Sequence, residues 1–79
     1  MGRYLAELYL PKSADIAAAT KQAKAAAESG PARCLRSIFV PEDETWFLLY
    51  ESPTIEAVQQ AVQHAGLPCA RVVGVVAAR

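Results

Sequence analysis

The chain has 79 residues, 53% of them hydrophobic, and its eight basic residues balance eight acidic ones. The basic residues are scattered from Arg3 to Arg79, and no apolar run approaches the ~18 residues of a membrane span, so we expect no nucleic-acid partner, no membrane partner and a cytoplasmic protein. Sixteen of the hydrophobic residues are alanines, which leaves a thin core for one chain of this length.

The first half of the chain predicts a strand and a helix. Arg3 to Leu10 carries apolar side chains at both alternating sets of positions, which is typical of a strand covered on both faces. Ser13 is placed to cap the next helix, whose apolar residues recur with the helical period from Ile16 to Ala27. The pair Gly30-Pro31 then ends that helix.

The second half predicts a hairpin, another helix and a last strand. Arg33 to Val40 and Thr45 to Glu51 are the two strands of the hairpin, joined by the turn PEDE. Thr54 caps a helix that runs to Gly66. Arg71 to Val76 is a β-branched final strand.

The order β-α-β-β-α-β predicts a single α+β domain over residues 1–79, of the ferredoxin-like plan. Right-handed crossovers give a four-stranded antiparallel sheet of order 4-1-3-2 with both helices on one face. Cys34 and Cys69 then lie at opposite sheet edges, about 14 Å apart, which is too far for a disulfide. We expect both to be buried free thiols.

The sheet face without helices is predicted to be apolar and to contain three aromatic residues. Such a patch is at or above the largest normally exposed by a soluble monomer, so we expect a homodimer packed sheet to sheet, as in dimeric α+β barrels. The alternative is a monomer that tolerates the patch. The residues expected on this face are Leu5, Glu7, Tyr9, Cys34, Arg36, Ile38, Val40, Trp46, Leu48 and Tyr50.

Glu7 interrupts this apolar face on a central strand, so its carboxylate must be paired, protonated or functional. One interpretation is an ion pair with Arg36, Arg3 or the other subunit that fixes the register of the interface. The other is a cavity between two sheets in which Glu7 is a base, a hydrogen-bond acceptor or a metal ligand. The ligand-binding residues predicted for that cavity are Glu7, Tyr9, Cys34, Arg36, Trp46 and Tyr50.

No catalytic motif is found in the sequence. His64 is the only histidine and lies near the end of the second helix, where we interpret it as a surface residue favoured by the helix C-terminus. Glu42, Asp43 and Glu44 form an acidic turn without the spacing of a calcium loop. Whether the protein is an enzyme is left open.

The run SIFVPEDETWFLLYESPTIEAVQQAVQHAGLP, Ser37 to Pro68, resembles the signature of a family of small proteins catalogued as a domain of unknown function. The signature reads approximately S-x-F-V-P-E-D-E-T-x-F-x-L-Y-E-A-P-S-x-E-A-V, ending in A-G-L-P. One characterised member of the family is a ferredoxin-like nickel-binding protein. The resemblance therefore implies the same fold and nickel binding, although the cysteines that relatives often carry around Trp46 and Leu48 are absent here.

Three functions follow from these observations. The first is a small dimeric binding protein for nickel or another divalent transition metal, with Glu7 and His64 as its metal ligands, or for a small apolar molecule. The second is a cofactor-free isomerase, cyclase or monooxygenase-like enzyme that uses Glu7 as acid or base in the barrel cavity. The third is a purely structural interaction module.

Overall fold

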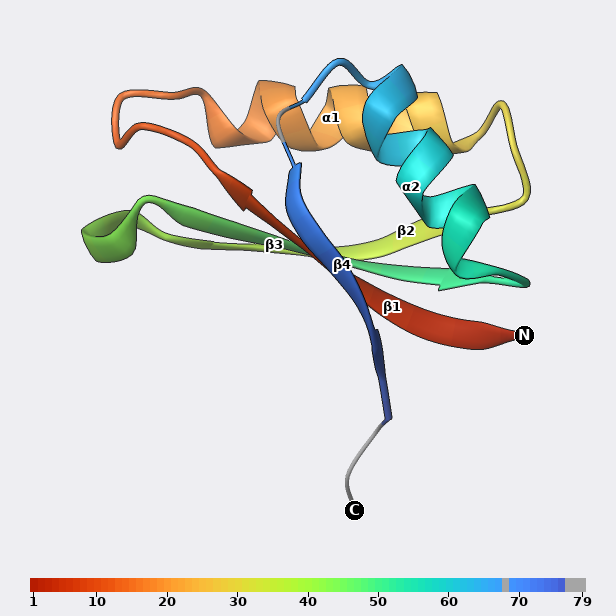
Figure 1. The fold of residues 1–79 in the computed structure, drawn as a ribbon. Coiled ribbons are helices and arrows are strands. Elements are labelled where there is room, and N and C mark those ends of the chain that lie inside the picture. The colour runs from red at the N-terminus through yellow and green to blue at the C-terminus, as the bar shows by residue number, and fades with distance from the viewer. Residues whose placement is uncertain (68, 77–79) are drawn as a thin grey trace.

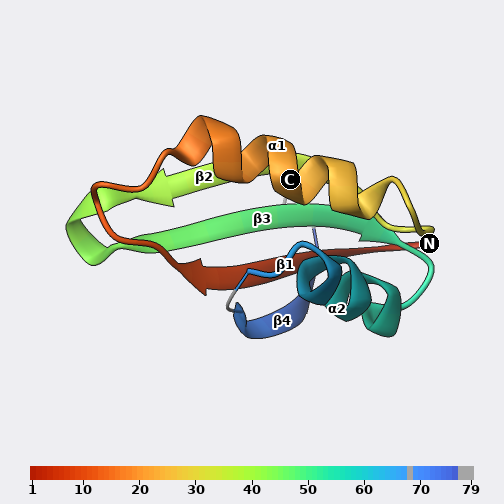
Figure 2. The same ribbon diagram turned by 90° about the horizontal axis from the view of Figure 1, so that it is seen from above.

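A computed structural model of the chain describes residues 1–67 and 69–76. It contains β1 (Gly2–Tyr9), α1 (Ile16–Ala27), β2 (Arg33–Val40), the short helix η1 (Pro41–Asp43), β3 (Thr45–Ser52), α2 (Ile55–His64) and β4 (Cys69–Val75). The sheet is antiparallel with the order β2-β3-β1-β4, and both helices cover one face of it, α1 near β2 and α2 near β4 (Figures 1 and 2). The predicted ferredoxin-like fold is confirmed. None of the described helices is long and apolar enough to cross a bilayer.

The ends of both helices have local causes in the sequence. The prediction of Ser13 as the cap of α1 is wrong, because Asp15 caps it by accepting a hydrogen bond from Ala18 N at 3.0 Å. Thr54 caps α2 as predicted and accepts from Ala57 N at 3.2 Å. Gly66 follows α2 with φ of 72°, a left-handed conformation that glycine adopts without strain.

The side chains of β3 lie on the opposite faces from those predicted. Residues paired across β1 and β3 share a face, and Ala6 pairs with Leu48 while Leu8 pairs with Trp46. All four are buried beneath the helices, as is Tyr50, so Trp46, Leu48 and Tyr50 are absent from the open face.

Alanine side chains on the helices give the physical reason for this arrangement. The buried faces of the helices present mainly small residues, among them Ala23, Ala27, Ala57 and Ala61. Small helix residues leave space above the sheet that must be filled to the usual packing density, and the indole of Trp46 fills it. Its Nε1 donates a hydrogen bond to Ser37 Oγ at 2.7 Å on the neighbouring strand.

A β-bulge in β2 changes the face of one predicted site residue. Cys34 pairs with Tyr50 and Arg36 pairs with Leu49, so Leu35 is an extra residue in β2. Cys34 therefore packs against the buried core on the helix side, contrary to the prediction, whereas Arg36 lies on the open face as predicted. Cys34 and Cys69 belong to the two edge strands, as expected.

Candidate functional site

The sheet face opposite α1 and α2 is named here the open face. Figure 1 shows both helices on one side of the sheet and the strands fanned by twist, with β4 steeply inclined to β2 and β3. The domain is a flat slab of 34 × 31 × 18 Å, so the open face is one of its two broad surfaces. Neither helix covers it within residues 1–67 and 69–76.

Five large apolar side chains occupy the centre of the open face and are named the apolar patch. They follow from the strand registers, which place Ile38 beside Phe47 and, in the next row, Leu49 beside Leu5 and Leu5 beside Val73. None of them is among the residues packed against the buried core; Ile38 is 54% exposed, and the other four are half-buried. The apolar patch comprises Leu5, Ile38, Phe47, Leu49 and Val73.

Glu7 lies at the border of the apolar patch in a polar cluster with two neighbours. Its Oε1 lies 3.3 Å from Nε of Arg71, the residue opposite it on β4, and its Oε2 accepts a hydrogen bond from the Tyr9 hydroxyl at 2.9 Å. The Glu7 side chain is 22% exposed and that of Arg71 is 67% exposed. The carboxylate is thus held in a fixed orientation while an edge of it stays accessible.

The ion-pair partner of Glu7 differs from those considered from the sequence. One interpretation of the sequence paired Glu7 with Arg36, Arg3 or the other subunit, but within this chain the antiparallel register of β1 and β4 brings Arg71 opposite Glu7. Arg36 lies in a different row, on β2, with β3 between it and β1. In the sequence, the only sign of this partner is that Arg71 is a basic residue at the start of the last predicted strand.

Tyr9 is the residue whose protonation this cluster alters. The hydrogen bond to Glu7, followed by the negative charge of Glu7, raises the pKa of the Tyr9 phenol above its ordinary value. The raised pKa keeps the phenol a neutral hydrogen-bond donor, and Tyr9 is 54% exposed at the surface. The cluster therefore offers a carboxylate, a phenol and a guanidinium beside an apolar surface.

The predicted ligand-binding set is divided between the two faces of the sheet. Glu7, Tyr9 and Arg36 lie on the open face, while Cys34, Trp46 and Tyr50 lie on the helix side. The cavity walled by Trp46 and Tyr50 is therefore not formed. The residues that the sequence reasoning missed are Arg71, Phe47 and Leu49.

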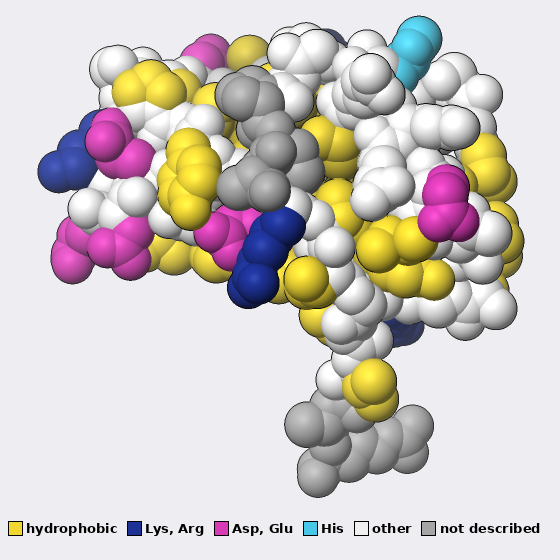
Figure 3. Space-filling view, viewed as in Figure 1, with side chains coloured by type: hydrophobic (Ala, Val, Ile, Leu, Met, Phe, Trp, Pro, Cys, Tyr) yellow, Lys and Arg dark blue, Asp and Glu magenta, His cyan; other side chains and the backbone are white. Residues whose placement is uncertain are grey.

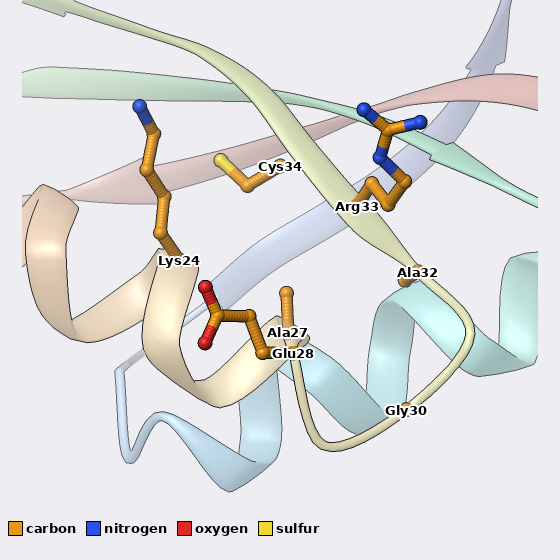
Figure 4. Close-up of a pocket in the computed structure, with 7 residues that line it drawn as sticks. All are labelled: Lys24, Ala27, Glu28, Gly30, Ala32, Arg33 and Cys34. Carbon is orange, nitrogen blue, oxygen red and sulfur yellow. The ribbon is translucent and has the colours of Figure 1, made fainter.

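Cys34 instead borders an open pocket between α1 and β2, with a volume of about 320 Å³. Figure 4 shows its thiol and the Lys24 amine directed into the space on the helix side of β2, while the Arg33 guanidinium points away. Burial raises the pKa of the Cys34 thiol, an effect that the charge of Lys24 and a backbone hydrogen bond at Arg36 oppose. The thiol is a weak nucleophile in this setting.

The two predicted metal ligands lie on opposite faces of the sheet. Glu7 is on the open face, and His64 ends α2 beside a groove of about 180 Å³ between the two helices. They do not form one metal site within this chain. Among the described residues, no group of three or more His, Cys, Asp or Glu side chains is placed to hold a metal ion.

Comparisons with known proteins bear on the fold. No protein-family model and no curated protein matches the chain. Among solved structures, the crystal structure of SCO4226 from Streptomyces coelicolor A3(2) is similar, with a TM-score of 0.86 and 18% sequence identity over 98% of this chain and 99% of that one. At this identity the likeness shows the fold alone, and the ferredoxin-like α+β domain spans essentially the whole chain.

Proposed function

We propose that the protein is a homodimeric binding protein whose two subunits pack through the open faces of their sheets. The observation that carries this proposal is the apolar patch, which no described element covers. Contiguous exposed apolar surface of this kind marks interaction sites in soluble proteins. A second copy presents the same apolar surface and is the simplest partner for it.

The size of the face is consistent with a dimer. Four strands about 4.8 Å apart, each about 25 Å long, make a face of about 480 Å² in projection. The accessible area of a corrugated surface exceeds its projection, and a standard interface takes ~800 Å² from each partner. Face-to-face sheets packed about 10 Å apart would place both copies of the patch in one shared core.

The cluster of Glu7, Tyr9 and Arg71 supports a binding role in addition to association. It lies at the border of the patch, so in the dimer it would line the edge of the space between the sheets. An apolar wall with a few fixed polar groups is typical of small-molecule sites. The ligand class that fits is a small, mostly apolar molecule with a hydrogen-bond donor for Glu7.

Light scattering of the purified chain tests the dimer. The expected mass is twice 8.5 kDa at micromolar concentration, and Phe47→Glu should reduce it to that of one chain because it places a charge in the apolar patch. Ala17→Glu makes the same change in charge at an exposed position on α1 and should leave the dimer intact. A single-chain mass for the unaltered protein would refute the dimer.

Binding can be tested with phenol and toluene as matched probes. Phenol has a hydroxyl donor that toluene lacks, so phenol should shift the NMR signals of Glu7 and Tyr9 while toluene shifts those of the apolar patch alone. Glu7→Gln should remove the preference for phenol and keep the dimer. Equal responses to the two probes would exclude Glu7 as the recognition group.

Catalysis is the second candidate, favoured by the carboxylate of Glu7 held in place by Tyr9 and Arg71. A fixed, partly accessible carboxylate is suited to proton transfer. If a reaction is found, Glu7→Gln should abolish turnover while light scattering still shows a dimer. Unchanged turnover in this variant would reject Glu7 as the acid or base.

A further inference from the structure

The two ends of the sheet carry opposite charges. One end carries three arginines, Arg3, Arg33 and Arg36, which are named the basic end. Glu51 lies among them and pairs with Arg33 at 3.9 Å, which leaves an excess of two positive charges. In the described part of the chain, neither Arg3 nor Arg36 makes an ion pair.

The other end of the sheet is acidic. Glu42, Asp43 and Glu44 follow β2 at the turn into β3 and are all exposed, and they are named the acidic turn. Lys12 contacts this turn, where its backbone N–H donates to Glu44 Oε2 at 2.8 Å, and counting its charge leaves an excess of two negative charges. Figure 3 shows Asp and Glu side chains gathered at this end of the molecule.

The two charged groups are separated by the length of the strands. In Figure 1, η1 lies at one end of β2 and β3, and the N-terminus of β1 lies at the other. Arg36 shares its row with Leu49 and Leu5 of the apolar patch, and the next row toward the acidic turn holds Ile38, Phe47 and the neutral pair of Glu7 and Arg71. The charges are therefore arranged as an apolar centre with complementary ends.

We infer that the partner of the open face is a second copy turned end for end, so that the acidic turn of each subunit lies against the basic end of the other. This inference rests on the proposed dimer and specifies its geometry. A two-fold axis in the plane between the sheets, perpendicular to the strands, produces this pairing twice, once at each end of the interface. An axis parallel to the strands would place like charges together at both ends, which opposes association.

Two charge-reversal variants test the geometry. The first, Arg3→Glu with Arg36→Glu, makes the basic end acidic, and the second, Glu42→Lys with Asp43→Lys, makes the acidic turn basic. In the end-for-end dimer, each variant faces its own copy with like charges. We expect the dimer dissociation constant of each to rise at least tenfold, measured by sedimentation or light scattering.

Mixing the two variants should restore association. A mixed dimer has opposite charges at both ends, so native mass spectrometry should show the heterodimer in large excess over either homodimer. Lys21→Glu with Lys24→Glu on α1 makes the same change in net charge as the first variant and should leave the dimer unchanged. Circular dichroism of each variant confirms that it is folded, since all the altered residues are exposed.

The outcomes separate the geometry from the dimer itself. If the unaltered chain is dimeric and neither variant weakens it, the end-for-end arrangement is overturned while the proposed dimer stands. If the unaltered chain is monomeric, both are overturned. Weakening by each variant and recovery in the mixture support the inference.

Discussion

The indole nitrogen of Trp46 donates a hydrogen bond to the hydroxyl of Ser37 at 2.7 Å, and this hydroxyl lies 2.9 Å from that of Thr20 on α1. The three groups connect β3, β2 and α1 through polar atoms within an otherwise apolar interior. Trp46 is completely buried, so its only polar atom is satisfied inside the protein. This pair keeps the largest side chain of the sheet beneath the helices.

Ser37→Ala should lower the free energy of unfolding by about 1–3 kcal/mol, because it leaves the buried indole N–H without its partner. Urea denaturation measures the loss. In a Trp46→Phe background the same substitution should cost clearly less, since phenylalanine has no N–H to satisfy. An equal cost in both backgrounds would show that the hydrogen bond contributes nothing.

Gly66→Ala should destabilise the protein by about 1–2 kcal/mol, because an L-residue at φ of 72° is strained even though no atom would contact its Cβ. Gly30→Ala is the matched control. A Cβ there also meets open space, and Gly30 has no positive φ, so its effect should be near zero or slightly stabilising. Thermal melts of both variants decide whether conformation or packing sets the requirement for glycine.

Tyr9 should titrate above its ordinary pKa of 10.0, and Glu7→Gln should lower the pKa again by removing the negative charge. The phenolate absorbance difference between Tyr9→Phe and its parent isolates this group. Because the folded pKa is raised, the contribution of Tyr9 to stability is full below the unfolded pKa and is lost as pH rises through the folded value. A Tyr9 titration that is identical with and without the Glu7 carboxylate would contradict the hydrogen bond.

Cys34 should react slowly with iodoacetamide in the native protein and much faster in urea, because burial raises the pKa of its thiol. Peptide mapping by mass spectrometry separates its reaction from that of Cys69. Lys24→Gln should slow the native reaction further, since the Lys24 charge opposes the shift. Lys21→Gln, an exposed change on the same helix, should leave the rate as it is.

The family resemblance predicts that chelator-treated protein takes up nickel, which calorimetric titration measures. The positions of Glu7 and His64 on opposite sides of the sheet predict that Glu7→Gln and His64→Ala do not both abolish binding. Sheet-to-sheet packing would leave His64 outside the interface, so it would not unite them either. Loss of the heat in both variants would contradict this placement, and no heat in the unaltered chain would remove the nickel prediction.

The order of the elements and the strand order were predictable because caps, breakers and apolar periods agree along the chain. Which side chains of β3 face the helices was not predictable, because Trp46 and Leu48 alternate with Phe47 and Leu49, which are nearly as apolar. Hydrophobicity alone cannot choose between two such sets. The choice comes from the alanines of the helices and from the hydroxyl of Ser37, which only the assembled fold brings to Trp46.

The candidate site was predictable only in part, because alternation along one strand can be read from the sequence, whereas bulges and strand registers cannot. Glu7 and Tyr9 alternate as predicted on β1, whose pairing with β3 is regular along that stretch, although its register with β4 shifts between Glu7 and Leu8. Cys34 changed face because of the extra residue Leu35, and nothing in the sequence of β2 marks a bulge there. Arg71 could be joined to Glu7 only through the register of β1 and β4, which links residues 64 positions apart.

The position of β1 between β3 and β4 also has a consequence for how the domain is made on the ribosome. β1 is synthesised before the other strands of the sheet, but one of its edges is completed only by β4, the last of these strands to emerge. Until then, the nascent chain exposes unpaired backbone groups along a strand that is apolar on both faces. Pairing of distant segments is also the slow part of folding. The interval before β4 appears is therefore when the chain is most exposed to aggregation and to chaperones.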